Sequence, residues 1–182
     1  MKVLVAYGTR YGATRGIAER IGRTLGACGH EVEVAEATGA LDARPYDAFV
    51  IGSAAYQGSW LEGPVDFVMR HVDLLSERPV WLFSSGPLGT EATDEQGRDQ
   101  LEITRPRQFD ELGKAVLPRG TRVFFGAMDP EQLRMVDRII RRLPTGHRLL
   151  PEGDFRDWAA IDAWAKEIGS ELPGGTPPAT TS

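Results

Sequence analysis

The sequence predicts a doubly wound α/β fold, in which helices cover both faces of a five-stranded parallel sheet of order 2-1-3-4-5. Three observations lead to this prediction. Short apolar runs of strand type alternate along the chain with segments whose apolar residues recur at helical spacing. The third and fourth runs, residues 47–52 and 79–83, are almost wholly apolar, as central parallel strands are. Loops of small residues follow the first, third and fourth runs, and in this strand order they meet at one edge of the sheet.

The five expected strands differ in how far they are buried. In chain order they are residues 2–7, 31–36, 47–52, 79–83 and 122–127. The first is a continuous apolar run. The second alternates acidic residues with valine, which indicates a half-exposed strand near a sheet edge. The third and fourth should therefore lie at the centre of the sheet.

The helices are indicated by apolar stripes and by residues that start or stop a helix. They are residues 14–28, 63–72, 108–116, 131–143 and 157–172. Gly29 ends the first, Pro64 suits the first turn of the second, and the third stops before Pro118. The stripes expected to face the core are Ile17, Ala18, Ile21 and Leu25; Val65, Val68, Met69 and Val72; and Trp158, Ile161, Trp164, Ala165 and Ile168. Residues 90–100 are acidic and polar and should form a loop.

Length and composition set limits on what the protein can be. We expect residues 1–172 to form one domain and residues 173–182 to be a disordered tail. The net charge of −5 argues against general nucleic-acid binding. The single cysteine excludes an intrachain disulfide, and no apolar stretch reaches the roughly 20 residues that span a bilayer. The expectation is a cytoplasmic protein without a transmembrane segment.

The loop after the first strand has the chemistry of an anion site. A short Gly/Thr loop that leads straight into a helix offers unpaired N–H groups, hydroxyl donors and the positive end of the helix dipole. The residues concerned are Thr9, Arg10, Tyr11, Gly12, Ala13 and Thr14. The loop has neither G-x-G-x-x-G nor a Walker lysine, which leaves a single phosphate as the expected ligand. The alternative is an ordinary strand-to-helix turn in which Thr14 is the N-cap.

Two further loops should lie at the same sheet edge. The second carries Tyr56, with Trp60 just beyond it, and either aromatic ring could stack on a flat ligand. The third is built of small residues that would let a ring approach closely. The candidate residues are Ser53, Ala54, Ala55, Tyr56, Gln57 and Gly58 in the second loop and Ser85, Gly86, Pro87, Leu88 and Gly89 in the third. The alternatives are that both aromatic rings pack beneath the loop or meet a partner protein, and that the third loop is a plain connection.

Other functional groups give weaker indications. No Cys/His cluster has the spacing of metal ligands, and no catalytic residue can be assigned, so any redox chemistry would belong to a cofactor. A basic patch spans residues 134–148 and contains Arg134, Arg138, Arg141, Arg142 and Arg148. It is either a solvated helix face or a docking surface for an acidic protein, a carboxylate-bearing substrate or the surface of a membrane.

The first loop resembles the phosphate-binding T-x-T-G-x-T loop of the flavodoxin family, with Tyr11 in place of a small hydroxyl residue. Its T-R-x-G-x-T form is similar to that of the flavodoxin-type protoporphyrinogen oxidases that use menaquinone. Residues 50–54 with Tyr56 and Gly58, residues 124–127, and Asp157-Trp158 are also similar to that subgroup. The resemblance implies a flavodoxin-like fold and non-covalent FMN, with its phosphate on residues 9–14 and its ring between loops 53–58 and 85–89.

The resemblance leaves three functions open. The first is an FMN-dependent oxidoreductase with a quinone acceptor and a porphyrin-type substrate. The second is an electron carrier that docks redox partners; the third loop, however, lacks the Gly-Asp pair and following aromatic residue usual in carrier flavodoxins. The third is a flavin-free α/β binding module.

Overall fold

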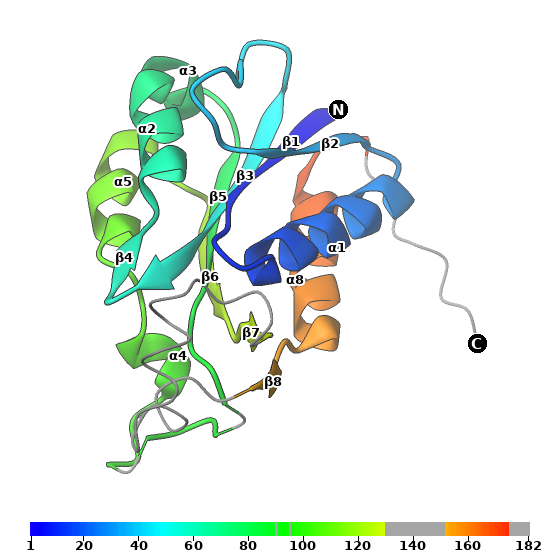
Figure 1. Ribbon diagram of the computed structural model, residues 1–182. Coiled ribbons are helices and arrows are strands. Elements are labelled where there is room, and N and C mark those ends of the chain that lie inside the picture. The colour runs from blue at the N-terminus through cyan, green and yellow to red at the C-terminus, as the bar shows by residue number, and fades with distance from the viewer. Residues whose placement is uncertain (90, 95, 130–151, 175–182) are drawn as a thin grey trace, which may run out of the picture.

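The computed structural model describes residues 1–89, 91–94, 96–129 and 152–174 of the 182-residue chain. A parallel sheet of order β2-β1-β3-β5-β6 runs through the molecule (Figure 1). Its strands are β1 (Lys2–Gly8), β2 (Glu31–Glu36), β3 (Ala48–Tyr56), β5 (Val80–Ser85) and β6 (Gly120–Phe124). A short strand, β4 (Ser59–Trp60), pairs antiparallel with β3. Taken in chain order, the five parallel strands have the order 2-1-3-4-5, which confirms the predicted fold class.

Helices cover both faces of this sheet (Figure 1). One face carries α1 (Ala13–Ala27) and α8 (Trp158–Glu171). The other carries α2 (Glu62–Arg70), α3 (Val72–Ser76) and α5 (Gln108–Val116). A one-turn helix, α4 (Gln100–Ile103), and a small antiparallel pair, β7 (Ala127–Met128) with β8 (Gly153–Asp154), lie beyond the carboxyl edge of the sheet.

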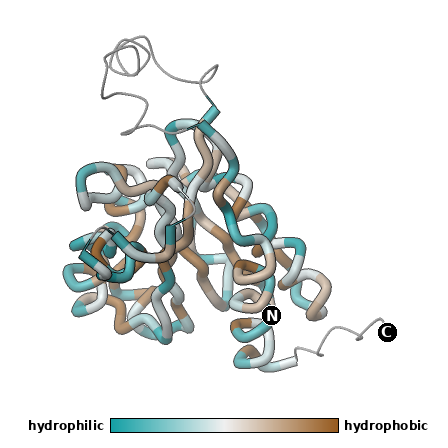
Figure 2. The backbone as a smooth tube through the Cα atoms, turned by 90° about the horizontal axis from the view of Figure 1, so that it is seen from below, coloured by the Kyte–Doolittle hydropathy of each residue, from teal (hydrophilic) through white to brown (hydrophobic). Residues whose placement is uncertain are grey.

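The alternation of side chains along each strand builds two cores. Along β1, Val3 and Val5 pack under α1 and α8, while Leu4 and Ala6 face α2 and α5. All four side chains are fully buried. Hydrophobic stretches accordingly follow the strands between the helix layers, and hydrophilic stretches are common on the outer turns (Figure 2).

The strands that flank the site extend further than the sequence predicted. β3 continues to Tyr56 and β5 to Ser85, so residues 53–56 and 84–85 are strand rather than loop. The parallel ladder continues through the pairs Ser53–Ser84 and Ala54–Ser85 because it is made by main-chain groups, whatever the side chains. Beyond Tyr56 the chain turns back through Gln57 and Gly58, both with positive φ (51° and 74°), the geometry of a two-residue hairpin.

Other boundaries also need correction. Met69 is 53% exposed and Phe67 takes the inward position instead, because Pro64, Phe67 and Val68 share the buried side of α2. The fifth parallel strand covers 120–124 rather than 122–127, since Ala127 pairs with β8 instead. The described residues of the polar segment 90–100 lie outside helices and strands as far as Asp99, whose side chain caps α4. The helix predicted at 131–143, the basic patch and the end of the tail (175–182) lie outside the described residues.

Candidate functional site

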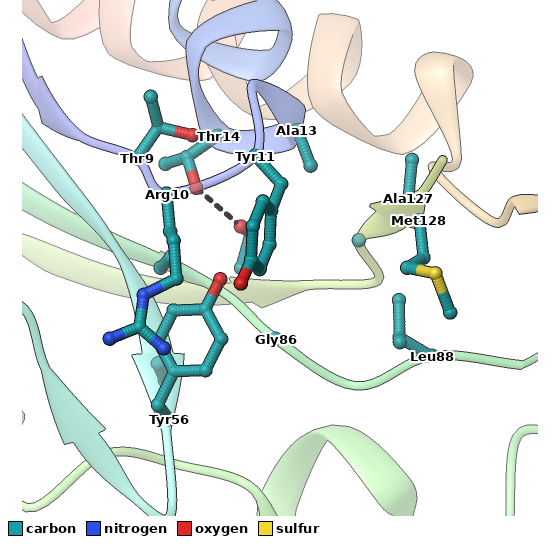
Figure 3. Close-up of a pocket in the computed structure, with 14 residues that line it drawn as sticks. Thr9, Arg10, Tyr11, Ala13, Thr14, Tyr56, Gly86, Leu88, Ala127 and Met128 are labelled. Carbon is teal, nitrogen blue, oxygen red and sulfur yellow. Dashed lines mark hydrogen bonds between the residues drawn. The ribbon is translucent and has the colours of Figure 1, made fainter. Parts of the chain in front are cut away.

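A hollow opens at the carboxyl edge of the sheet, where the strand order reverses between β1 and β3 (Figure 3). It encloses about 650 Å³, part of which is continuous with solvent. Its walls come from the segments that follow β1, β3, β5 and β6. The residues are Thr9, Arg10, Tyr11, Ala13, Thr14, Ala54, Ala55, Tyr56, Ser85, Gly86, Leu88, Gly126, Ala127 and Met128.

The first loop closes on itself before α1 begins. The hydroxyl of Thr9 accepts the N–H of Gly12 at 3.0 Å. Gly12, with φ of 82°, is the N-cap of α1, a left-handed conformation that a side chain would disfavour. The alternative in which Thr14 caps the helix is therefore wrong. No side chain of the described residues caps α1, so N–H groups of its first turn are available to an anion.

Thr14 and Ser85 form a buried link between the first and third loops. Their hydroxyl oxygens lie 2.8 Å apart (the dashed line in Figure 3), and the two residues are 0% and 3% exposed. A hydroxyl can donate one hydrogen bond and accept others. The Thr14 hydroxyl can therefore accept a hydrogen bond from Ser85 and still donate its own proton to an oxygen atom of a ligand.

Aromatic groups stand on one side of the hollow. The Arg10 guanidinium lies 4.5 Å from the ring centroid of Tyr56, and the ring of Tyr11 meets the ring of Tyr56 edge-on at 6.4 Å (Figure 3). The side chains of Leu88 and Met128 stand on the opposite side (Figure 3). Arg10 is the single formally charged side chain among the described residues that line the hollow.

Some of the candidate residues do not line this hollow. The hydroxyl of Ser53 is fully buried on the other side, where it accepts the N–H of Leu61 at 3.0 Å. Gln57 and Gly58 form the exposed hairpin turn. Trp60 packs in the core on the α2 and α5 side of the sheet, where its ring lies 5.8 Å from the ring of Phe109. This agrees with the alternative prediction that its ring packs beneath the loop.

Three more candidates lie around or beside the hollow. Gly12 lines a neighbouring hollow, on the β7–β8 side of Tyr11 and Ala13. Pro87 contributes its carbonyl, which accepts the N–H of Gly126 at 2.9 Å. Gly89, with φ of 116°, continues the third loop without entering the lining.

Sequence reasoning missed the fourth wall, made by Gly126, Ala127 and Met128. The available signal was the end of the fifth strand, because the carboxyl ends of all parallel strands lie at the same edge. The Pro87–Gly126 hydrogen bond joins this wall to the third loop.

A tyrosine comes shortly before the first loop, outside the residues that line the hollow. Tyr7, at the end of β1, has a raised pKa because of burial, and so stays protonated at neutral pH. The described residues contain no group of three or more His, Cys, Asp or Glu side chains placed to hold a metal ion.

The donors of the hollow suit the phosphate of FMN. An uncapped helix start and the Thr14 hydroxyl are groups that bind a phosphate, and small residues at positions 54, 55, 86 and 126 line the hollow together with Tyr56. A Cβ at Gly86 would lie 3.2 Å from the carbonyl oxygen of Ala55, so a larger residue there would press on the backbone of β3.

A family model described as a flavodoxin domain matches residues 4–146, and the chain belongs to this family. Solved flavodoxin structures share the fold at low identity. A cysteine-to-serine mutant of the flavodoxin from Pseudomonas aeruginosa has a TM-score of 0.59 at 17% identity, covering 96% of this chain and 100% of that one. Oxidised flavodoxin 2 from Bacillus cereus has a TM-score of 0.56 at 22% identity, covering 94% and 100%. No helix among the described residues is long and apolar enough to cross a membrane.

Proposed function

We propose that this protein binds FMN non-covalently in the hollow and acts as an FMN-dependent oxidoreductase. The observation that carries the proposal is the convergence of an uncapped helix start, a buried hydroxyl pair and an aromatic wall on one hollow. When bound, FMN supplies one- and two-electron transfer, and the protein supplies binding and orientation. The first turn of α1 would hold the phosphate, and Tyr56 and Gly86 would flank the ring.

The third loop favours an oxidoreductase over an electron carrier, because it lacks the Gly-Asp pair and the following aromatic residue that are usual in carrier flavodoxins. In place of an aromatic residue, the aliphatic side chains of Leu88, Ala127 and Met128 line that side of the hollow. From the resemblance of the T-R-x-G-x-T loop we infer a quinone as the electron acceptor and a porphyrin-type molecule as a candidate substrate.

The first experiment tests FMN binding. Purified protein stripped of flavin is titrated with FMN, and quenching of flavin fluorescence is followed. The blocking variant is Gly126→Leu, whose Cβ fits at 3.6 Å from Leu88 but whose longer side chain would enter the hollow. The matched control is Gly39→Leu, at an exposed position with nothing within 4 Å of a Cβ. We expect FMN to bind the wild type and the control but not the blocked variant. Absence of binding to the wild type at millimolar FMN would refute the proposal.

A second experiment separates enzyme from carrier. Reduced protein is mixed with a quinone and its reoxidation is followed; porphyrinogen oxidation is assayed separately. Turnover of either molecule supports the oxidoreductase. Stable reduced protein that passes electrons only to another redox protein would support the carrier instead.

A further inference from the structure

A segment far along the chain reaches the back of the first loop. Residues 153–158 leave β8, pass behind the start of α1 and enter α8. Gly153, Asp154 and Arg156 of this segment line the neighbouring hollow of about 630 Å³, together with Tyr11, Gly12 and Ala13. Arg156 of this segment makes a hydrogen bond to the first turn of α1.

Arg156 is fixed by contacts on several sides. Its Nε and Nη2 donate to the two carboxylate oxygens of Asp154, each at 2.7 Å. Its guanidinium lies 4.4 Å from the ring centroid of Trp158, and its Nη1 donates to the carbonyl oxygen of Ala13 at 3.3 Å. Only 17% of the side chain is exposed.

Gly16 makes room for this arrangement. A Cβ at Gly16 would collide with Nη1 of Arg156. Glycine is a poor residue for a helix interior, because it lowers helix stability relative to alanine. At this position it lets the guanidinium lie against the first turn of the helix.

We propose that Arg156 is a positioning residue for the anion site: it holds the first turn of α1 from behind and thereby sets the direction of the N–H groups that receive a phosphate. It does so through Ala13 and Gly16 rather than as an anion ligand, because Asp154 already pairs with its charge. Hydrogen bonds at both ends of a planar fork give Arg156 a fixed geometry that lysine cannot reproduce. This inference rests on the proposed binding of FMN.

The test compares FMN with riboflavin, which has the same ring but no phosphate. Arg156→Met keeps much of the stem and removes the donors. We expect the FMN affinity of this variant to fall about tenfold, because the hydrogen bond that fixes the phosphate-binding turn is lost. Its riboflavin affinity should change less than about twofold, because riboflavin has no phosphate. The matched control is Arg44→Met, because Arg44 pairs with Asp42 two residues earlier in the same way but lies away from the hollow.

A second pair of variants approaches the same contact from the helix. Gly16→Ala should displace Arg156 and reduce FMN affinity to the level of Arg156→Met. Gly26→Ala, in the same helix with nothing within 4 Å of a Cβ, should leave FMN affinity unchanged. In the Arg156→Met background, Gly16→Ala should add no further loss, because the group that it displaces is gone.

The possible results distinguish a failure of the positioning role of Arg156 from a failure of FMN binding. Equal FMN affinity of the wild type and Arg156→Met, or equal loss of FMN and riboflavin, overturns the positioning role. Full affinity in Arg156→Lys also overturns it, because charge alone would then suffice. If the wild type binds no FMN, or binds FMN no better than riboflavin, the phosphate site itself is refuted and the inference falls with it.

Discussion

The hydroxyl pair of Thr14 and Ser85 provides the most direct test of how the site is built. Thr14→Val keeps the shape of the side chain and removes its hydroxyl, which leaves the hydroxyl of Ser85 buried without this partner. An unpaired buried polar group destabilises the fold by about 1–3 kcal/mol. For a chain of this size each kcal/mol lowers Tm by about 2–4 °C, so we expect a Tm lower by about 2–12 °C.

The double variant isolates the pair itself. Ser85→Ala should also destabilise the fold, because it leaves the buried hydroxyl of Thr14 without this partner. In Thr14→Val with Ser85→Ala neither hydroxyl remains, so the combined loss should be smaller than the sum of the single losses by about 1–2 kcal/mol. Urea unfolding of the four proteins without flavin measures this coupling. Losses that simply add would refute a direct hydrogen bond between the two side chains.

FMN titration of the same proteins tests the second role of Thr14. A phosphate oxygen only accepts hydrogen bonds, so Ser85 would donate to Thr14 and Thr14 to the phosphate. Losing a hydrogen bond to a charged acceptor is worth about 1.5–3 kcal/mol, about 10- to 150-fold in affinity. Thr14→Ser should retain most of the affinity. Unchanged FMN affinity in Thr14→Val would move the phosphate elsewhere in the hollow.

Three further predictions concern the scaffold. Gly52→Ala should destabilise by about 1–3 kcal/mol in urea unfolding, because its Cβ would overlap the buried ring of Phe83. Asp162→Asn should lower stability at neutral pH, because the hydrogen bond from Arg20 holds the pKa of Asp162 below its ordinary value of 3.8. Because the pKa of Asp162 is lower in the folded state than in the unfolded state, its carboxylate stabilises the fold at a pH above the unfolded pKa, and this stabilisation is lost as the pH falls. The free energies of unfolding of the two proteins, measured in urea from pH 7 to pH 3, should therefore converge. Gln57→Gly should raise Tm by about 1–4 °C. A left-handed φ of 51° costs a non-glycine residue about 1–2 kcal/mol, and the greater chain entropy of glycine offsets about 0.5–1 kcal/mol of this, which leaves about 0.5–1 kcal/mol.

Each of these has a result that would contradict it. Wild-type stability in Gly52→Ala would mean that the sheet moves to admit the methyl group. A constant difference between wild type and Asp162→Asn at all pH values would show that the carboxylate charge is not what stabilises. A lower Tm in Gln57→Gly would mean that the Gln57 side chain contributes more than its backbone strain removes.

The fold could be predicted because its signals are local and its topology rules are general. Apolar runs mark the central strands, and acid–valine alternation marks β2 at the sheet edge. The exact ends of the strands could not be predicted in this way. Ser53 and Ser84 are polar and resemble loop residues in sequence, but the ladder continues through them because main-chain groups make it.

The local features of the candidate site could likewise be predicted from the sequence, but the directions of its side chains could not. The sequence alone predicted that three small-residue segments meet at the edge where the strand order reverses, and that the first leads into the start of a helix. These are properties of short segments and of parallel topology. The sequence left open whether Thr14 caps that helix, which the structure decided. Which side chains face the hollow depends on the phase of each strand end, and this turned Ser53 away and brought Ala54 and Ser85 in.

Only the tertiary structure decided the contacts that give the site its form. Thr14 meets Ser85 across 71 positions of sequence, and Arg156 meets Ala13 across 143. The predicted strand order already implied that β6 pairs with β5, but it did not imply the hydrogen bond from Gly126 to the Pro87 carbonyl, which joins the wall of Gly126 to Met128 to the third loop. No spacing along the chain encodes such meetings; they arise when the sheet and its helices pack, which fixes distant segments at hydrogen-bonding distance.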